Sequence, residues 1–201
     1  YERVLESIAE RGLDANISIK PTALGLLIDK EAAHGSIERI VRKASESQTF
    51  VRLDMEDHRA TQATIDAAKA MHSMGLYNVG VVLQGRMHRT PEDISDYCQF
   101  TGNQADFRIC KGIYLEPPEI AHTSYWDIVN ATNSAIDSML DSGAYTAIAS
   151  HDLPIIEHSL EALDSRGMGP SIEDPRHESQ VSRSQGKGNG YEFQFLLGVR
   201  G

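Results

Sequence analysis

Residues 79–84 read Val-Gly-Val-Val-Leu-Gln, a continuous apolar run that ends on a single amide side chain, Gln84. Short apolar runs of this kind are typical of strands that are buried on both faces of a parallel sheet. A buried amide needs hydrogen-bond partners, which indicates that Gln84 lies where other groups can receive its bonds. The run therefore predicts a buried strand whose carboxyl end borders a site.

On both sides of this run, apolar strands alternate with helical patterns, which is the signature of βα units around a parallel sheet. The sequence predicts strands at 17–20, 50–54, 79–84, 107–111, 146–151 and 192–197. It predicts helices from the start to about residue 11 and at 37–45, 59–74, 91–101, 124–142 and 154–166. Thr90, before Pro91, is expected to cap the fourth helix, and Gly75 and Gly143 are expected to end two others in the left-handed conformation.

The polar residues that end the predicted strands distinguish between two architectures. These residues are Lys20, Asp54 with Glu56, Gln84, Lys111, and His151 with Asp152. In a (β/α)8 barrel all strand ends converge on one mouth, whereas an open doubly wound sheet scatters them along a crevice. The glycine pattern of neither a dinucleotide-binding turn nor a phosphate-binding loop follows a predicted strand. We therefore expect an α/β fold of the (β/α)8 TIM-barrel type, distorted, with six of the eight strands present.

Length and composition restrict the function classes. The 201 residues suit one catalytic domain, which we interpret as a piece of a longer barrel protein, with residues 167–190 as an exposed insertion loop. The formal net charge of -10 argues against nucleic-acid binding. No apolar run approaches the roughly 20 residues of a membrane span. Cys98 and Cys110 fit neither a disulfide framework nor a zinc site, so we expect a reducing compartment and no metal.

Strand periodicity places residues two apart on the same face. Arg52 lies on the face of Asp54, and Glu192 on the face of Gln194. For Arg52 and Glu192, a paired ionic core and a functional role are equally open. Function is favoured for three residues at or near strand ends: Lys20, Asp54 and Arg108.

The aromatic and histidine residues give weaker signals. His151 suits a site residue and a helix cap equally well. The other histidines are expected on the surface, at positions 58, 72, 88, 122, 158 and 177. Tyr125 and Trp126 are expected to pack against the protein as part of a helix.

Taken together, six segments resemble the proline dehydrogenase family, and they occur in the family's order over most of the chain. They are residues 18–25 (Ser-Ile-Lys-Pro-Thr-Ala-Leu-Gly), 51–57 (Val-Arg-Leu-Asp-Met-Glu-Asp), 79–84, 107–117 (Phe-Arg-Ile-Cys-Lys-Gly-Ile-Tyr-Leu-Glu-Pro), 147–152 and 192–196. The resemblance implies a distorted (β/α)8 barrel that carries FAD, with strands two to seven in this chain. It also implies that the family's carboxylate-binding arginine pair lies beyond Gly201. Pro21, Ile113 and Ser150 depart from the leucine, alanine and threonine that are usual in the family.

The resemblance also implies roles for individual residues. Lys20 would face the carboxylate of L-proline, Asp54 would pair with Lys20, and Arg108 would lie beside the flavin N5 and stabilise its developing negative charge. Tyr114 and Leu196 would pack against the pyrrolidine ring. The residues implied to line the FAD site are Met55, Gln84, Lys111, Gly112, Ile113, Ser150, His151 and Gln194.

The implied reaction is hydride transfer from proline C5 to flavin N5, which yields 1-pyrroline-5-carboxylate. The electrons would pass to a quinone, which implies transient contact of an otherwise cytoplasmic protein with the inner membrane, on the matrix side in a eukaryote. Two alternatives stay open. One is a Schiff-base lyase of the barrel class that uses Lys20 or Lys111 as nucleophile. The other is a catalytically inactive fragment.

Overall fold

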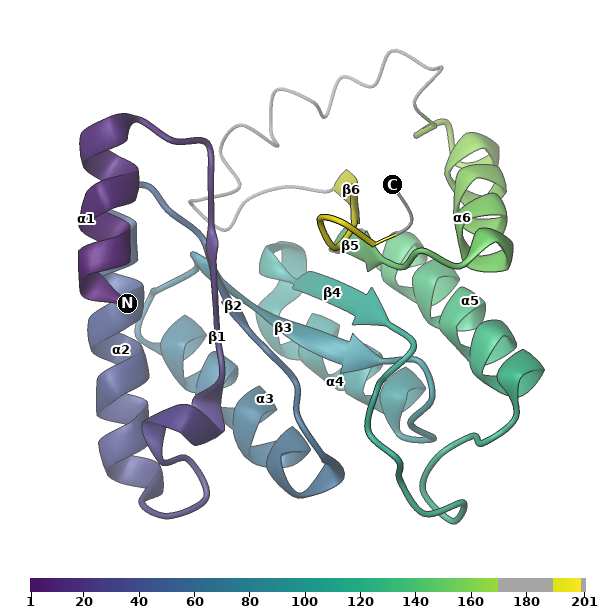
Figure 1. Ribbon diagram of the computed structural model, residues 1–201, viewed down its shortest axis with the longest axis horizontal. Coiled ribbons are helices and arrows are strands. Elements are labelled where there is room, and N and C mark those ends of the chain that lie inside the picture. Colours follow the sequence, from purple (N-terminus) through teal and green to yellow (C-terminus); the bar gives the residue numbers. More distant parts are fainter. Residues whose placement is uncertain (170–189, 200–201) are drawn as a thin grey trace. The chain divides into compact units, whose positions relative to one another are not determined.

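The computed structural model describes residues 1–169 and 190–199, and the predicted alternation of strands and helices is confirmed there (Figure 1). The helices are α1 (Glu2–Arg11), α2 (Lys30–Glu46), α3 (His58–Ser73), α4 (Thr90–Thr101), α5 (Tyr125–Asp141) and α6 (Leu153–Ser165), with short 3-10 turns η1 (Pro21–Leu24) and η2 (Gly102–Gln104). The strands are β1 (Ile17–Ile19), β2 (Val51–Leu53), β3 (Val79–Gln84), β4 (Asp106–Cys110), β5 (Tyr145–Ala149) and β6 (Gly190–Gln194). Of the expected insertion at 167–190, residues 170–189 lie outside the described part.

The strands belong to one sheet in the order β1-β2-β3-β4-β5-β6. The pairs β1·β2, β2·β3, β4·β5 and β5·β6 are parallel. Several strands end one or two residues earlier than predicted, so that Lys20, Asp54, Lys111 and His151 lie just beyond them. Along the chain, the described residues form two compact units, residues 1–82 and residues 83–169 with 190–199.

In the first unit, three short strands supply a buried apolar core. The register aligns Ile17 with Val51 and Val51 with Val79, and all three side chains are buried. Helix α2 begins seven residues before its predicted start, because the Asp29 carboxylate accepts a hydrogen bond from the Ala32 backbone N–H (3.0 Å) and caps it. Its first turns are mostly exposed and therefore lack the apolar spacing from which the sequence predicts helices.

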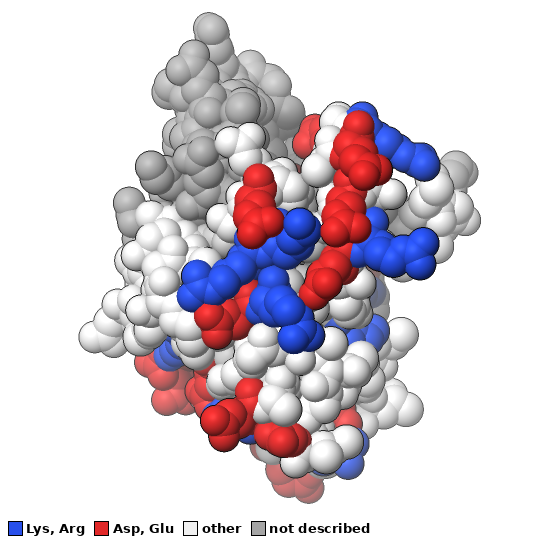
Figure 2. Space-filling view, turned by 90° about the vertical axis from the view of Figure 1, so that its left-hand side faces the viewer, with Lys and Arg blue, Asp and Glu red and all other residues white. Residues whose placement is uncertain are grey.

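The outer surface of this unit carries both signs of charge. Helices α1 and α2 lie side by side and are joined by the ion pair of Arg39 with Glu2, at 3.1 Å. Within α2, Arg42 pairs with Glu38 at 2.7 Å. Figure 2 shows acidic and basic side chains interspersed on this face. Exposed pairs of this kind contribute little to stability, and the mixture maintains solubility.

In the second unit, β4, β5 and β6 align Arg108 with Ala147 and Ala147 with Glu192. Phe107 is fully buried on β4 and contacts the ring of Tyr97 on α4, with centroids 5.3 Å apart. Directly after β3, Gly85 approaches helix α5 so closely that an added Cβ would lie 2.1 Å from Thr132 Oγ1. Glycine is therefore required at position 85.

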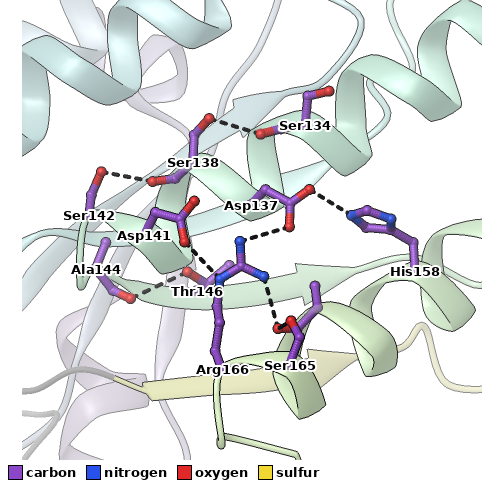
Figure 3. Close-up of polar contacts among 11 residues, drawn as sticks. Ser134, Asp137, Ser138, Asp141, Ser142, Ala144, Thr146, His158, Ser165 and Arg166 are labelled. Atoms are coloured by element: carbon purple, nitrogen blue, oxygen red, sulfur yellow. Dashed lines mark hydrogen bonds and ion pairs between the residues drawn. The ribbon is translucent and has the colours of Figure 1, made fainter.

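A polar cluster ties α5 to the end of α6 (Figure 3). Arg166 donates to Asp141 (2.7 Å) and pairs with Asp137 (3.1 Å), which also contacts His158 at 2.9 Å. The hydrogen bond from Arg166 lowers the pKa of the Asp141 carboxyl, and the same bond raises the pKa of Arg166. When Arg166 and the two aspartates are charged, the cluster thus holds α5 against the end of α6.

Several local predictions can be checked at single residues. Gly75 and Gly143 have positive φ (77° and 70°), as expected for helix ends. Thr90 is not a cap: it is the first residue of α4, and its hydroxyl donates to the Gln84 carbonyl at 2.5 Å. His72 is buried, not on the surface, and its Nε2 lies 3.1 Å from the Val79 carbonyl oxygen.

The expectation that Tyr125 and Trp126 pack against the protein is wrong. Both lie at the start of α5 with exposed side chains, Trp126 at 60%. They contact one another edge to face, with ring centroids 4.9 Å apart. Within the described part of the chain, no helix is long and apolar enough to cross a membrane, and no three His, Cys, Asp or Glu side chains gather in a group suited to a metal ion.

Candidate functional site

At the sheet face of the second unit, a chain of hydrogen bonds runs from β4 to β6. The Arg108 Nε–H donates to Oε1 of Gln194 at 2.5 Å. The Gln194 Nε2–H donates in turn to Oε1 of Glu192, also at 2.5 Å. All three side chains are partly buried. The predicted site residues Arg108 and Gln194 are thus brought together, with Glu192 as the third member of the chain.

The end of β4 and the segment after β5 meet through Lys111. Its ammonium lies 2.6 Å from the Asp152 carboxylate, whose other oxygen accepts a hydrogen bond from the Tyr125 hydroxyl at 2.9 Å. The Lys111 Nζ also lies 5.3 Å from the centre of the Tyr125 ring, within the range of a cation–π contact. Asp152 therefore fixes the direction in which Lys111 extends from the sheet.

Ser150 and His151 order the same segment. The buried Ser150 accepts a hydrogen bond from the Asp152 backbone N–H at 3.0 Å, which makes it part of a turn. His151 Nε2 accepts from the Leu196 backbone N–H at 2.9 Å, so it does not cap α6 with its side chain. This bond holds the segment after β6, where the Leu196 side chain is exposed.

The loop after β4 is held by the residues that follow β3. Gly85 and Arg86 donate backbone hydrogen bonds to the carbonyls of Cys110 (2.7 Å) and Lys111 (3.0 Å). The Arg86 guanidinium donates to the Tyr114 carbonyl (2.5 Å), which sets the course of the backbone there. Arg86 thereby positions two predicted site residues: Tyr114, which is partly buried, and Ile113, whose side chain is exposed.

Gly112 and Gln84 lie against each other in this loop. The Gly112 backbone has φ +101°, and a Cβ added there would lie 2.7 Å from Oε1 of Gln84. Gln84 is almost fully buried, as the sequence predicts for an amide at the end of an apolar strand. Only glycine lets the backbone at 112 come this close to the Gln84 amide.

In the first unit, the ends of β1 and β2 carry the predicted pair. Lys20 Nζ lies 3.8 Å from Asp54 Oδ2, with 54% and 24% of the two side chains exposed. Next to them, both oxygens of Glu56 bind Thr22, one accepting from its hydroxyl (2.7 Å) and the other from its backbone N–H (3.1 Å). Met55, between Asp54 and Glu56, is buried.

The start of helix α3 follows directly and is fixed by Asp57. Its carboxylate accepts from the Arg59 backbone N–H at 3.0 Å as the helix cap. The hydrogen bond from the Arg59 side chain lowers the pKa of the Asp57 carboxyl. The short segment from Asp54 to Asp57 is therefore anchored at both ends.

The sequence missed several residues that organise these clusters. Arg86 acts through a loop far along the chain, and Tyr125 meets Asp152 only because α5 returns to the sheet. Glu56 carried a signal in the sequence, since it follows a strand end beside Asp54. The Thr22 hydroxyl as its partner had none, because the two residues are 34 positions apart.

Comparison with known proteins finds similarity along nearly the whole chain. The proline dehydrogenase family model matches residues 1–199. Proline dehydrogenase 2 of Bacillus subtilis is 29% identical over 198 residues, which cover 98% of this chain and 58% of the relative. Proline dehydrogenase of Deinococcus radiodurans is 27% identical over 202 residues, with the same coverage. The chain thus spans rather more than half the length of these curated relatives.

Solved structures show the same fold. A proline utilization A protein of Bdellovibrio bacteriovorus, inactivated by N-propargylglycine, superimposes with a TM-score of 0.78 at 17% identity, over 98% of this chain and 23% of that one. Proline utilization A of Bradyrhizobium japonicum gives a TM-score of 0.73 at 14% identity, over 98% and 21% of the two chains. This likeness confirms the α/β fold of the TIM-barrel type that the strand ends predict. The match of the family model over residues 1–199 shows that the chain belongs to the proline dehydrogenase family.

Proposed function

We propose that the protein of which these residues form part oxidises L-proline to 1-pyrroline-5-carboxylate with FAD as the electron acceptor. The observation that carries the proposal is the placement of Arg108, a cation on strand β4 whose guanidinium donates a hydrogen bond to Gln194. Family membership supports proline as the substrate. A cation held in place on the sheet supports a reaction in which negative charge develops on a bound cofactor.

The donor set of the second unit suits a flavin. Arg108, Lys111 and the Gln84 amide supply hydrogen-bond donors, and Gly112 supplies a backbone without a side chain, at a place where a Cβ would meet Gln84. Ile113 offers an exposed apolar side chain next to that backbone. In this proposal Gln84, Lys111, Gly112, Ile113, Ser150, His151 and Gln194 hold the cofactor together with Met55, and FAD supplies the hydride acceptor at N5.

Lys20 and Asp54 are proposed to receive the substrate carboxylate. Lys20 has an exposed ammonium whose position is biased by Asp54 at 3.8 Å. A lysine ammonium carries three N–H donors, so that Lys20 retains donors for an anion while it pairs with Asp54. Tyr114 and Leu196 are proposed to contact the pyrrolidine ring.

The electron balance follows from the substrate. C5 of proline loses a hydride, the ring nitrogen loses a proton, and the C5=N double bond of 1-pyrroline-5-carboxylate forms. The protein's part is to hold the ring against the cofactor face, which supplies the orientation that hydride transfer requires. We further propose that a quinone takes up the electrons, and that a cytoplasmic protein, or a matrix protein in a eukaryote, touches the inner membrane transiently for that step.

The Schiff-base alternative is less consistent with the structure. A nucleophilic lysine is activated by a desolvated pocket or by a neighbouring cation. Lys20 and Lys111 instead face carboxylates, and their side chains are 54% and 37% exposed. Borohydride treatment of the full-length protein with a carbonyl substrate therefore should leave no covalent adduct.

The central test uses the full-length protein. It should be yellow as purified, and L-proline added without oxygen should bleach the flavin absorbance. Arg108→Met should lower kcat for flavin reduction by roughly 100-fold with a smaller change in KM, since the cation matters as charge develops. Lys20→Met should act mainly on KM, and Arg3→Met on exposed α1 is the matched control. The proposal would be refuted if the protein takes up no flavin, or if its bound flavin stays oxidised after proline is added.

A further inference from the structure

Arg108 reaches across a whole strand to meet its partner. It lies on β4 and Gln194 on β6, with β5 between them, and neighbouring strands are about 4.8 Å apart. Arg108 aligns with Ala147, which aligns with Glu192, while Ala149 aligns with Gln194. The two β5 positions on this face are both alanine, whose methyl groups leave a path for the arginine side chain.

The hydrogen bonds along this path have a fixed direction. A guanidinium only donates and a carboxylate only accepts, whereas a glutamine amide does both, through different atoms. Gln194 turns its oxygen to Arg108 and its nitrogen to Glu192. The bond to Glu192 thus favours one orientation of the Gln194 amide, and in that orientation the Gln194 oxygen accepts from the Arg108 Nε–H.

Glutamine at position 194 matches both neighbours, because its amide accepts through one atom and donates through another. A glutamate there would set its carboxylate against that of Glu192, and a methionine would leave the Arg108 Nε–H without this acceptor. The neutral amide thus links the two charged groups. A fixed arrangement of this kind matters where a cation must be in place before charge develops.

We propose that Glu192 and Gln194 are positioning residues for Arg108, and that Ala147 keeps their path across β5 open. The proposal rests on the proposed function of Arg108 beside the cofactor. Glu192 would act through the guanidinium, and Gln194 would do so in addition to its proposed contact with FAD. The loss of either residue should therefore change the rate of flavin reduction while leaving the affinity for proline nearly unchanged.

The experiment measures how well the Arg108 Nε–H is protected from solvent exchange. Full-length protein labelled with 15N-arginine gives an Nε–H signal for Arg108, assigned by its loss in Arg108→Lys. Gln194→Met should raise the solvent exchange rate of this hydrogen by at least about tenfold, because its acceptor is gone. Glu192→Gln should give a smaller increase in the exchange rate, since the Gln194 amide can then turn over and present its nitrogen to Arg108. Ala147→Val should act like Gln194→Met by obstructing the path.

Matched controls lie on exposed helix positions of the same unit: Gln99→Met on α4 and Glu157→Gln on α6 should leave the exchange rate unchanged. In the same variants, Gln194→Met should lower kcat of proline oxidation roughly tenfold with KM within about threefold of wild type. An unchanged exchange rate in both Gln194→Met and Glu192→Gln overturns the inference, as does an effect on KM alone. A wild-type protein that oxidises no proline instead refutes the proposed function, while the exchange rates still decide the positioning role.

Discussion

The close approach of Gly85 to helix α5 allows one stability prediction to be worked out from the coordinates. In Gly85→Ala, the new Cβ would lie 2.1 Å from Thr132 Oγ1 and 2.7 Å from both its Cα and its Cβ. Carbon atoms in contact normally lie about 3.5–4.0 Å apart, so the helix must retreat by roughly 1 Å. Because two of the three clashing atoms belong to the helix backbone or its first side-chain carbon, a rotamer change at Thr132 cannot relieve them.

The expected loss lies at the upper end of the range for overpacked cores, about 3 kcal/mol in the free energy of unfolding. For a chain of this size that corresponds to a drop in Tm of roughly 6–12 °C. Adding Thr132→Ala to Gly85→Ala removes Oγ1 but leaves Cα and Cβ in place. The double variant should therefore recover only part of the lost stability.

The same chemical change at Gly35 serves as the control. Gly35 is an exposed residue inside α2, and a Cβ there would meet no atom within 4 Å. Gly35→Ala should raise the free energy of unfolding by about 0.5–1 kcal/mol, since alanine is the better helix former. Urea unfolding followed by circular dichroism measures both variants. Overpacking should cost more than about 0.5 kcal/mol. The reasoning is therefore refuted if the free energy of unfolding of Gly85→Ala falls by less than that amount.

Three further predictions concern local contacts. Because Arg166 lowers the pKa of the Asp141 carboxyl, the stability that this pair contributes is present above the ordinary pKa of 3.8 and is lost as the pH falls below it. Thermal unfolding should show Arg166→Gln less stable than wild type at neutral pH, with a gap that narrows toward about pH 3; an equal gap at both values would contradict this. Asp29→Ala removes the cap of α2 and should lower the free energy of unfolding by about 1 kcal/mol, whereas Asp29→Ser should retain most of it; equal losses would exclude capping as the reason. Thr90→Val removes the hydroxyl that donates to the Gln84 carbonyl and should lose about 1 kcal/mol in urea unfolding, with Thr90→Ser close to wild type.

The sequence alone was sufficient for the order of elements, and its resemblance to the proline dehydrogenase family implied the pairing of Lys20 with Asp54. A strand or helix leaves its period in the residues that form it, and parallel strands end at the same edge of a sheet, so residues just after β1 and β2 come together. The end of the 79–84 run also had a local signal, because a buried amide such as Gln84 needs partners wherever the chain carries it. Periodicity failed where a segment is exposed, as in the first turns of α2.

Tertiary structure decided the contacts between elements that are distant along the chain. Trp126 is of a type that is usually buried, yet it is exposed, and His72 is of a type expected on the surface, yet it is buried. The burial of each side chain depends on which neighbouring element covers its face of the helix. The link from Arg108 through Gln194 to Glu192 likewise requires the register of three strands and two alanines between the charged ends. Sequence patterns carry the period of each element, but the partner that fills the space beside a side chain is set by packing over the whole sheet, which no local pattern encodes.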